Sequence, residues 1–487
     1  MTGGIGRPVA AAWHRLADTV RSWSPEWRDC FLYASSAVFA ALTVVAAGIP
    51  LYAEWGRLAL GPYAAAAAFM ALVAHRAGVA RRRAAGTSGP GGVDDTPGGA
   101  DLLGEAPLPD ARRFRAARIV ALLVVLVGAT VVPLSLEVVW ASEGNAALHV
   151  QPEVLVVERA GVRVDAGKDP YQVVDRDGRI VIHQRSEPVY ELYYPYLPGM
   201  VLFGFSSGSK VHARLTDARI QFLLFTAVVS LITLSRLRPA TDARFRALQV
   251  LTVLPTAALP LATGGDDMPV VALMLAGLVA LQRRRPLLAG LALGAASSLK
   301  FTAWPLAFLA AWAALDRGQR RAVGRYALGV LLVVGPVVVP VALSNPSAFV
   351  DNVIRFPLGL AGAASPAASA LPGHMIVTAF PGIHKGYVLA LVVIGLVVLA
   401  RRLFVRPPTD AAGVARLTGW VMLVAIVLAP ATRVGYLLYA VNLFVWAWML
   451  RGAVDPEPVD EGGGGPASST EAADGGAPGT AEPLVST

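Results

Sequence analysis

One acidic residue in a polar stretch is the first candidate for catalysis. Glu153 follows the hydrophobic run Ile119–Trp140 and lies near the start of the polar segment 151–199. A carboxylate at the boundary between membrane and water can accept the proton of an acceptor hydroxyl during group transfer. A solvated carboxylate in the first turn of a helix, favoured by the helix dipole, would give the same pattern. The sequence therefore offers Glu153 as a candidate general base and leaves this second interpretation open.

The same segment contains a tight turn and a group of tyrosines. The turn GKDPY occupies residues 167–171 and includes Asp169 and Tyr171. Four tyrosines follow within seven residues: Tyr190, Tyr193, Tyr194 and Tyr196. Tyrosine rings stack on sugars, and they also gather at the headgroup level of membranes. Because two prolines interrupt this group, we favour a rigid, shaped surface, with Asp169, Tyr171, Tyr193 and Tyr194 as predicted substrate contacts.

Two adjacent acids and three separated cations are the other candidates. Asp266 and Asp267 lie in ATGGDDMP, where they could bind a metal or orient sugar hydroxyls, although Asp267 before Met-Pro is also a good helix start. Lys300 and Arg433 are predicted on the outer side, against the usual cytoplasmic bias of basic residues, and suit an anionic group such as a lipid phosphate. His374 is a third candidate phosphate contact.

The composition sets the class of protein. Of 487 residues, 55% are hydrophobic and only 15% are charged, against roughly 25% charged in soluble domains. Many apolar runs are long enough to cross a bilayer, and they do not alternate as barrel strands would. The sequence therefore predicts an all-α polytopic membrane protein.

The placement of charge and the single cysteine exclude other classes. The net charge is +9, but the basic residues cluster at the ends of apolar runs, so nucleic-acid binding is not supported. Cys30 alone cannot form an intramolecular disulfide. No His/Asp/Glu spacing resembles a zinc site, and no glycine-rich phosphate loop opens a helix. Nucleotide use at the cytoplasmic face is therefore not supported. We expect no cofactor and assign no metal site, while Asp266 and Asp267 leave the use of a metal open.

About twelve crossings put each basic cluster on the cytoplasmic side, together with both termini. The predicted spans are 29–49, 57–77, 117–140, 214–236, 246–262, 269–282, 286–299, 301–315, 323–343, 385–402, 416–431 and 434–450. The predicted domains are a cytoplasmic amphipathic segment (1–28), two accessory helices (29–78), a flexible cytoplasmic linker (79–116), a catalytic membrane domain (117–451) and a disordered cytoplasmic tail (452–487).

The motifs, taken in order, resemble a known family. Glu153, the GKDPY turn, the run YPYLP at 194–198, GDDMP at 265–269, Leu299-Lys300 and TRVGY at 432–436 resemble the GT-C superfamily of polyprenol-phosphate-sugar-dependent glycosyltransferases. Within it the resemblance is to glycosyltransferase family 87, of the alpha-mannosyltransferase type. Two positions depart from the family pattern: Glu153 stands where the family has Asp, and Tyr196 interrupts a Tyr-Pro-Pro motif.

The resemblance implies a GT-C-like helical bundle with an extracytoplasmic catalytic loop in the cell membrane. Its activity would be the inverting transfer of a sugar, mannose by this resemblance, from a polyprenyl-phosphate donor to a glycolipid or glycan acceptor. Glu153 would be the base, and Lys300, Arg433 and His374 would contact the phosphate. A transporter or flippase of a lipid-linked sugar and a catalytically inactive scaffold are the alternatives.

Overall fold

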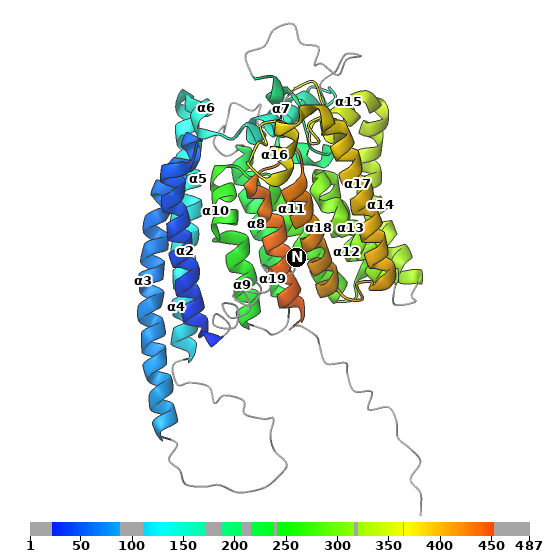
Figure 1. Ribbon diagram of the computed structural model, residues 1–487. Helices are drawn as coiled ribbons and strands as arrows, with labels where there is room; N and C mark the ends of the chain where they lie inside the picture. The colour runs from blue at the N-terminus through cyan, green and yellow to red at the C-terminus, as the bar shows by residue number, and fades with distance from the viewer. Residues whose placement is uncertain are drawn as a thin grey trace, which may run out of the picture. The chain divides into compact units, whose positions relative to one another are not determined.

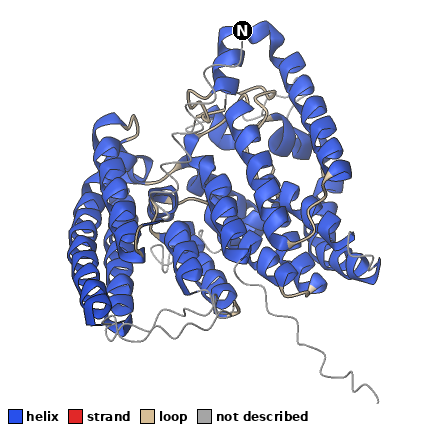
Figure 2. Cartoon of the chain, turned by 60° about the horizontal axis from the view of Figure 1, so that its bottom comes forward, coloured by secondary structure: helices blue, strands red, loops and turns tan. Residues whose placement is uncertain are grey.

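The computed structural model describes residues 22–87, 111–171, 188–205, 216–237, 241–315, 320–363 and 365–451. Almost all regular structure in these ranges is helical (Figures 1 and 2), and the strand-type pairing among them is one isolated bridge between Ala368 and Thr432. The prediction of an all-α protein is therefore confirmed. The predicted amphipathic segment before residue 22 and the acidic tail 452–487 lie outside the described residues.

The first two helices form an antiparallel pair. Helix α2 (Pro25–Ala46) begins with proline in its first turn and with Ser24 as its cap, and α3 (Pro50–Thr87) packs along it. Helix α2 begins within the predicted segment 1–28, and α3 continues past residue 78 to Thr87, while the domain boundaries at 28 and 78 stay predictions. Apolar side chains define the membrane portion of a helix, but the helix itself continues through the arginines 81–83, which are good helix formers.

The third crossing is interrupted where the chain approaches the polar segment. Helix α4 (Ala111–Leu126) leads through a π-helical turn (Val127–Val131) into α5 (Val132–Trp140). A second π-helical turn (Ala141–Asn145) bends at Gly144, whose φ of 106° suits glycine. Two short helices follow, α6 (Ala146–His149) and α7 (Pro152–Asp165). The chain therefore changes direction before Glu153.

The centre of the bundle is α11 (Asp267–Gln282), which packs against several neighbours and has 12 buried residues out of 16. Its neighbours include α8 (Ala218–Ser235), α10 (Pro255–Thr263), α12 (Pro286–Leu299), α13 (Trp304–Leu315), α18 (Ala411–Leu428) and α19 (Leu437–Arg451). A helix that is apolar on all sides is expected in such a position. Asp267 is therefore placed at the end of the most enclosed helix.

The remaining helices lie around this centre. Helix α9 (Thr241–Thr252) is joined to α10 by a bend of 43°. Helix α14 (Arg320–Ser344) packs on α12, and α17 (His384–Val405) is the least buried of the long helices. The short helices α15 (Pro346–Val350) and α16 (Pro372–Ala379) lie at the same end of the bundle as α7 in Figure 1.

Eight helices among the described residues are long and apolar enough to cross a membrane, or nine if the bent pair α9–α10 crosses as one. Helices α11, α12 and α13 have 16, 14 and 12 residues, short of the roughly 17 that a straight crossing needs. By length and composition, eight or nine crossings are therefore shown among the described residues, and the predicted twelve stay a prediction. The difference arises because proline and charged residues divide the apolar stretch 267–315 into three short helices.

A close contact between two glycines holds α7 against a short 3-10 helix, and a main-chain hydrogen bond connects that helix to α12. A Cβ atom on Gly161 of α7 would lie 2.0 Å from the carbonyl oxygen of Gly204, so only glycine allows this contact. Gly204 ends the short 3-10 helix Pro198–Phe203. Just before that helix, the Leu197 amide donates to the Leu299 carbonyl at 3.0 Å. The helix of Glu153 is thereby connected to the residue next to Lys300.

Candidate active site

Lys300 lies between the two adjacent aspartates. Its Nζ is 3.2 Å from Asp266 Oδ1 and 2.5 Å from Asp267 Oδ1. All three residues are buried, with exposed fractions of 9%, 3% and 8% respectively. The proximity follows from chain geometry, since α11 and α12 are antiparallel neighbours of similar length joined by a short turn. The start of α11 and the end of α12 therefore meet at one end of the bundle.

Aromatic rings enclose this triad. The Tyr196 ring centroid is 5.2 Å from Lys300 Nζ and that of Tyr436 is 5.7 Å away, within cation–π range. The hydroxyl of Tyr439 donates to Asp267 Oδ1 at 2.6 Å and accepts from Thr302 at 2.8 Å. Tyrosines with one apolar face and one polar end can hold a buried charge in place and still present a surface to a ligand.

Glu153 forms an ion pair with Arg433. The carboxylate is in the first turn of α7, and its Oε1 contacts Nη1 of Arg433, which lies just before the 3-10 turn Val434–Tyr436 that leads into α19. The two side chains are 19% and 25% exposed. The other oxygen, Glu153 Oε2, is buried and accepts no hydrogen bond. An arginine has five N–H donors, so one contact with Glu153 leaves donors for another anion.

The ion pair and the Lys300 triad belong to one electrostatic cluster. Burial raises the pKa of Asp266 to about 6; Asp267 and Glu153 act in the same direction, and Lys300 opposes them. Burial alone would lower the pKa of Lys300, but the two aspartates outweigh it and raise that pKa. With all groups ionised, three carboxylates face two cations. Because one aspartyl group titrates near pH 6, the net charge of the cluster changes close to neutral pH.

His374 lies beside the same chain segment as Arg433 without reaching the ion pairs. Its Nδ1 is 2.8 Å from the carbonyl oxygen of Pro430, and its Nε2 is 3.4 Å from Thr378 Oγ1. The imidazole thus bonds α16 to the loop that carries Arg433. Its role as a phosphate contact stays a prediction.

Residues 212–430 match glycosyltransferase family 87. This part of the chain is a family 87 glycosyltransferase domain. The resemblance read from the motifs is confirmed over this range, and membership of the family implies transferase activity. No curated protein and no solved structure matches the chain.

The family 87 domain contains the aspartates and Lys300, whereas Glu153 precedes it and Arg433 follows it by a few residues. The described structure brings these five residues together from separate parts of the chain. The matched range therefore supplies one part of the cluster, and the segments on either side supply the rest.

Four predicted contacts of the polar segment have protein partners instead. Asp169 accepts from the Tyr171 amide at 2.8 Å, and the Tyr171 hydroxyl donates to the Tyr196 carbonyl at 2.9 Å. Tyr193 stacks on Phe356 with centroids 4.5 Å apart. The Tyr194 amide donates to Asn352 at 2.7 Å. Asp169 and Tyr171 thus fix the loop that orients Tyr196 beside the family 87 aspartates, and direct substrate contact stays a prediction for all four.

Sequence reasoning missed three side chains of the cluster. Tyr196 was noted only as part of the tyrosine group, and Tyr439 and Thr302 were not singled out. A signal for Tyr439 exists in retrospect, because Tyr436 and Tyr439 are three residues apart at the start of a helix and therefore share a face. Thr302 has no signal of its own, since its role depends on the bond to Tyr439.

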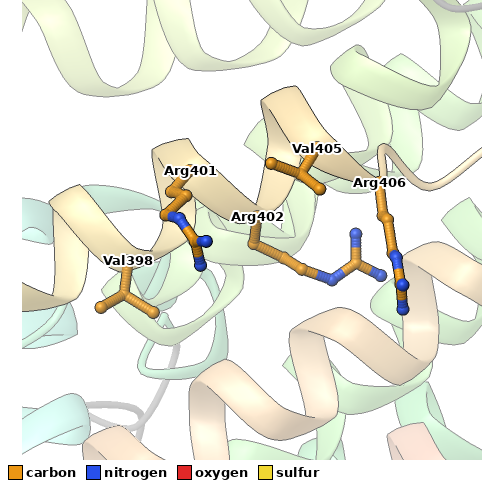
Figure 3. A pocket seen from close by; sticks show the side chains of 5 residues that line it. All are labelled: Val398, Arg401, Arg402, Val405 and Arg406. Atoms are coloured by element: carbon orange, nitrogen blue, oxygen red, sulfur yellow. The ribbon is translucent and has the colours of Figure 1, made fainter.

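A second candidate region lies at the C-terminal end of α17. A pocket of about 420 Å³ is lined there by Val398, Arg401, Arg402 and Val405 of this helix and by Arg406, which follows it (Figure 3). A 22-residue helix is about 33 Å long, so this pocket is far from the α16 end of α17. Its lining contains guanidinium groups but no carboxylate or hydroxyl group. This agrees with the prediction from the sequence that basic residues cluster at the ends of apolar runs. It contributes no group to the family 87 cluster.

Proposed function

We propose that this protein transfers a sugar from a polyprenyl-phosphate donor to an extracytoplasmic glycolipid or glycan acceptor with inversion at the anomeric carbon. The sugar is mannose by family resemblance. The observation that supports the proposal most strongly is the buried, unpartnered Oε2 of Glu153, two bonds away from the oxygen held by Arg433. An oriented carboxylate oxygen with no donor is free to accept the proton of an incoming hydroxyl.

In the proposed reaction, the acceptor oxygen attacks the anomeric carbon while its proton passes to Glu153 Oε2. The bond between the anomeric carbon and the phosphate oxygen breaks, and the polyprenyl phosphate leaves with the electron pair. Arg433 has further N–H donors for that phosphate, and Lys300 has three, of which the two aspartates use at least two. Donors that are fixed before reaction stabilise the developing charge without reorganisation.

The aspartates have a separate role in this scheme. The ammonium group of Lys300 lies between them, where a metal ion bound by both would lie. We assign Asp266 and Asp267 to holding Lys300 and to accepting hydrogen bonds from sugar hydroxyls. Tyr196 and Tyr436 line the same triad and supply ring faces for the sugar.

The deciding experiment uses purified protein in proteoliposomes with a radiolabelled polyprenyl-phosphate mannose and an acceptor extract from membranes. Labelled product in the acceptor fraction is expected. Movement of the labelled donor between leaflets without transfer would instead support a flippase, and neither transfer nor movement would support an inactive scaffold. Glu143→Gln, which changes an exposed carboxylate near the same end of α5, is the matched control and should transfer at the wild-type rate.

We further propose twelve crossings with both termini in the cytoplasm, with α11, α12 and α13 each crossing as short helices in a locally thinned bilayer. The protein has a single cysteine, Cys30, so a Cys30→Ser background allows site-specific labelling. A cysteine at Lys168, in the exposed turn after α7, should react with an impermeant maleimide added outside intact cells. A cysteine at Arg401 should react only after lysis, and the reverse pattern would contradict this orientation.

A further inference from the structure

A second group of ionisable side chains lies at the junction of the accessory helices and the polar segment. It consists of Glu54 from α3, Glu137 from α5 and His149 from α6. Each offers one possible metal-ligand atom, and these three atoms lie within 4.8 Å of one another. Nδ1 of His149 is 2.8 Å from Glu137 Oε2 and 3.3 Å from Glu54 Oε2. None of these residues belongs to the Glu153–Lys300 cluster.

The hydrogen bonding of this group is incomplete. Glu137 is fully buried, and its Oε1 accepts no hydrogen bond. Glu54 Oε2 is also buried without a hydrogen-bond donor, although the Glu54 side chain as a whole is 30% exposed. A buried carboxylate oxygen without a donor is costly. Both carboxylates lie beside the same imidazole nitrogen, and each has one oxygen without a donor, which indicates that a positively charged partner completes the group.

Among the residues that the structure describes, the cationic side chain paired with Glu54 and Glu137 is His149 alone. The guanidinium of Arg219 has other partners: its Nη1 donates to the main-chain oxygen of His149 at 2.6 Å, and its Nε and Nη2 donate to Asp217. The Trp140 ring packs against the imidazole, with centroids 5.3 Å apart. A protonated His149 would neutralise only one of the two carboxylates.

We propose that Glu54, Glu137 and His149 bind a divalent transition-metal cation, with Zn²⁺ as the ion that fits this ligand set. Zinc binds imidazole nitrogen and carboxylate oxygen at roughly 2.0–2.2 Å in tetrahedral geometry, which places neighbouring ligand atoms about 3.3 Å apart. The separation between His149 and Glu54 already has this value. Three protein ligands and the partial exposure of Glu54 leave the fourth position for water.

The site would fix the segment that leads to Glu153. His149 ends α6, and two residues later Gln151 donates to Tyr52 of α3 at 3.2 Å and to Thr263 of α10 at 2.6 Å. A cation that joins α3, α5 and α6 would therefore determine where α7 begins. This gives the first two helices a role in positioning the polar segment, and it holds whether or not the chain transfers a sugar.

The test is metal binding by tag-free, full-length protein, because a polyhistidine tag would itself bind zinc. After EDTA treatment and removal of the chelator, titration calorimetry with ZnCl₂ should show about one ion per chain, and elemental analysis after dialysis should agree. Glu54→Gln and Glu137→Gln should each weaken binding by about 100-fold or more, beyond the 10–100-fold that supporting residues contribute. Glu143→Gln should bind as wild type, and MgCl₂ should bind far more weakly than ZnCl₂.

Wild-type protein that retains no zinc and shows no saturable binding would overturn the proposal and would leave a histidine ion pair as the explanation. Zinc binding that is unchanged in Glu54→Gln would overturn it too. Glu54 is the safer variant for this purpose, because its side chain is partly exposed and its substitution leaves the buried Glu137–His149 pair in place. If Glu137→Gln fails to elute as a monodisperse species, Glu54→Gln alone decides.

Discussion

Two clusters of buried charge in this protein differ in how completely their polar atoms are paired. One surrounds Asp29 of α2, which is fully buried. Its Oδ2 accepts from Arg118 of α4 at 2.5 Å, and its Oδ1 accepts from Gln249 of α9 at 3.0 Å and from Arg246. Arg118 also donates to Asp242 at 2.6 Å. The other cluster surrounds Glu153 and Lys300, where Glu153 Oε2 has no donor.

We interpret the difference as one between a structural cluster and the catalytic cluster that we propose. The Asp29 cluster joins the accessory helices to the start of α9, and both oxygens of its central carboxylate have donors. A fully paired network of this kind makes the packing of its helices specific. At the Glu153 cluster, a buried oxygen and the partly exposed Arg433 are available to a ligand. Both clusters contain buried charge, so burial does not distinguish them. They differ because Glu153 Oε2 has no hydrogen-bond donor.

The largest expected effect on stability is at the Asp29 cluster. Asp29→Ala leaves Arg118 and Arg246 without their shared carboxylate in a buried position. Removing one partner of a buried pair costs about 3–5 kcal/mol. Thermal unfolding in detergent should show a large loss of stability, whereas Glu153→Ala should be much milder because both members of its pair are partly exposed. Equal losses at the two clusters would remove the distinction between them.

A smaller effect concerns the pH dependence of the Lys300 triad. Because burial raises the pKa of Asp266 to about 6, ionising this group in the folded protein is unfavourable. Its contribution to stability is therefore present at low pH and is lost as pH rises through 6. The slope is at most about 1.4 kcal/mol per pH unit. Unfolding measured between about pH 4 and 6, the interval between the unfolded and folded pKa of this group, should show a smaller pH slope in Asp266→Asn than in the wild type, and an unchanged slope would place this titration elsewhere.

Activity should show the same titration. Below about pH 6 the protonated Asp266 leaves the cluster with one negative charge fewer, which favours an anionic donor. The KM for the polyprenyl-phosphate donor should therefore fall as pH falls from 7 to 5.5, and Asp266→Asn should make it nearly independent of pH over this range. A wild-type KM that rises over the same interval would contradict the assignment.

Some of this site follows from the sequence alone. Lys300 stood out because a lone cation on the outer side is unusual, and its pairing with Asp267 follows from two consecutive antiparallel helices of similar length. The all-helical class followed from the length of the apolar runs. These features depend on local composition and on neighbours in the chain, which the sequence contains directly.

Other features depend on contacts between segments that are far apart in the chain, and the periodicity of apolar residues does not predict such contacts. The partner of Glu153 is 280 residues away at Arg433, and nothing in either motif specifies the other. The three ligands of the proposed zinc site, Glu54, Glu137 and His149, come from three separate helices. For this reason they show no zinc-like spacing in the sequence. Asp169 and Tyr171 were predicted as substrate contacts because they are polar, but their observed partners are the main chain of their own turn and of Tyr196.

The most direct test of the account is the turnover of Glu153→Gln, measured on folded protein with the donor at saturation. A general base contributes roughly 10²–10⁴ in rate, so turnover should fall by about that factor while donor affinity and the melting temperature stay close to wild type. Glutamine has nearly the shape of glutamate and cannot accept the proton. Turnover at the wild-type rate in this variant would contradict the assignment of Glu153 as the base.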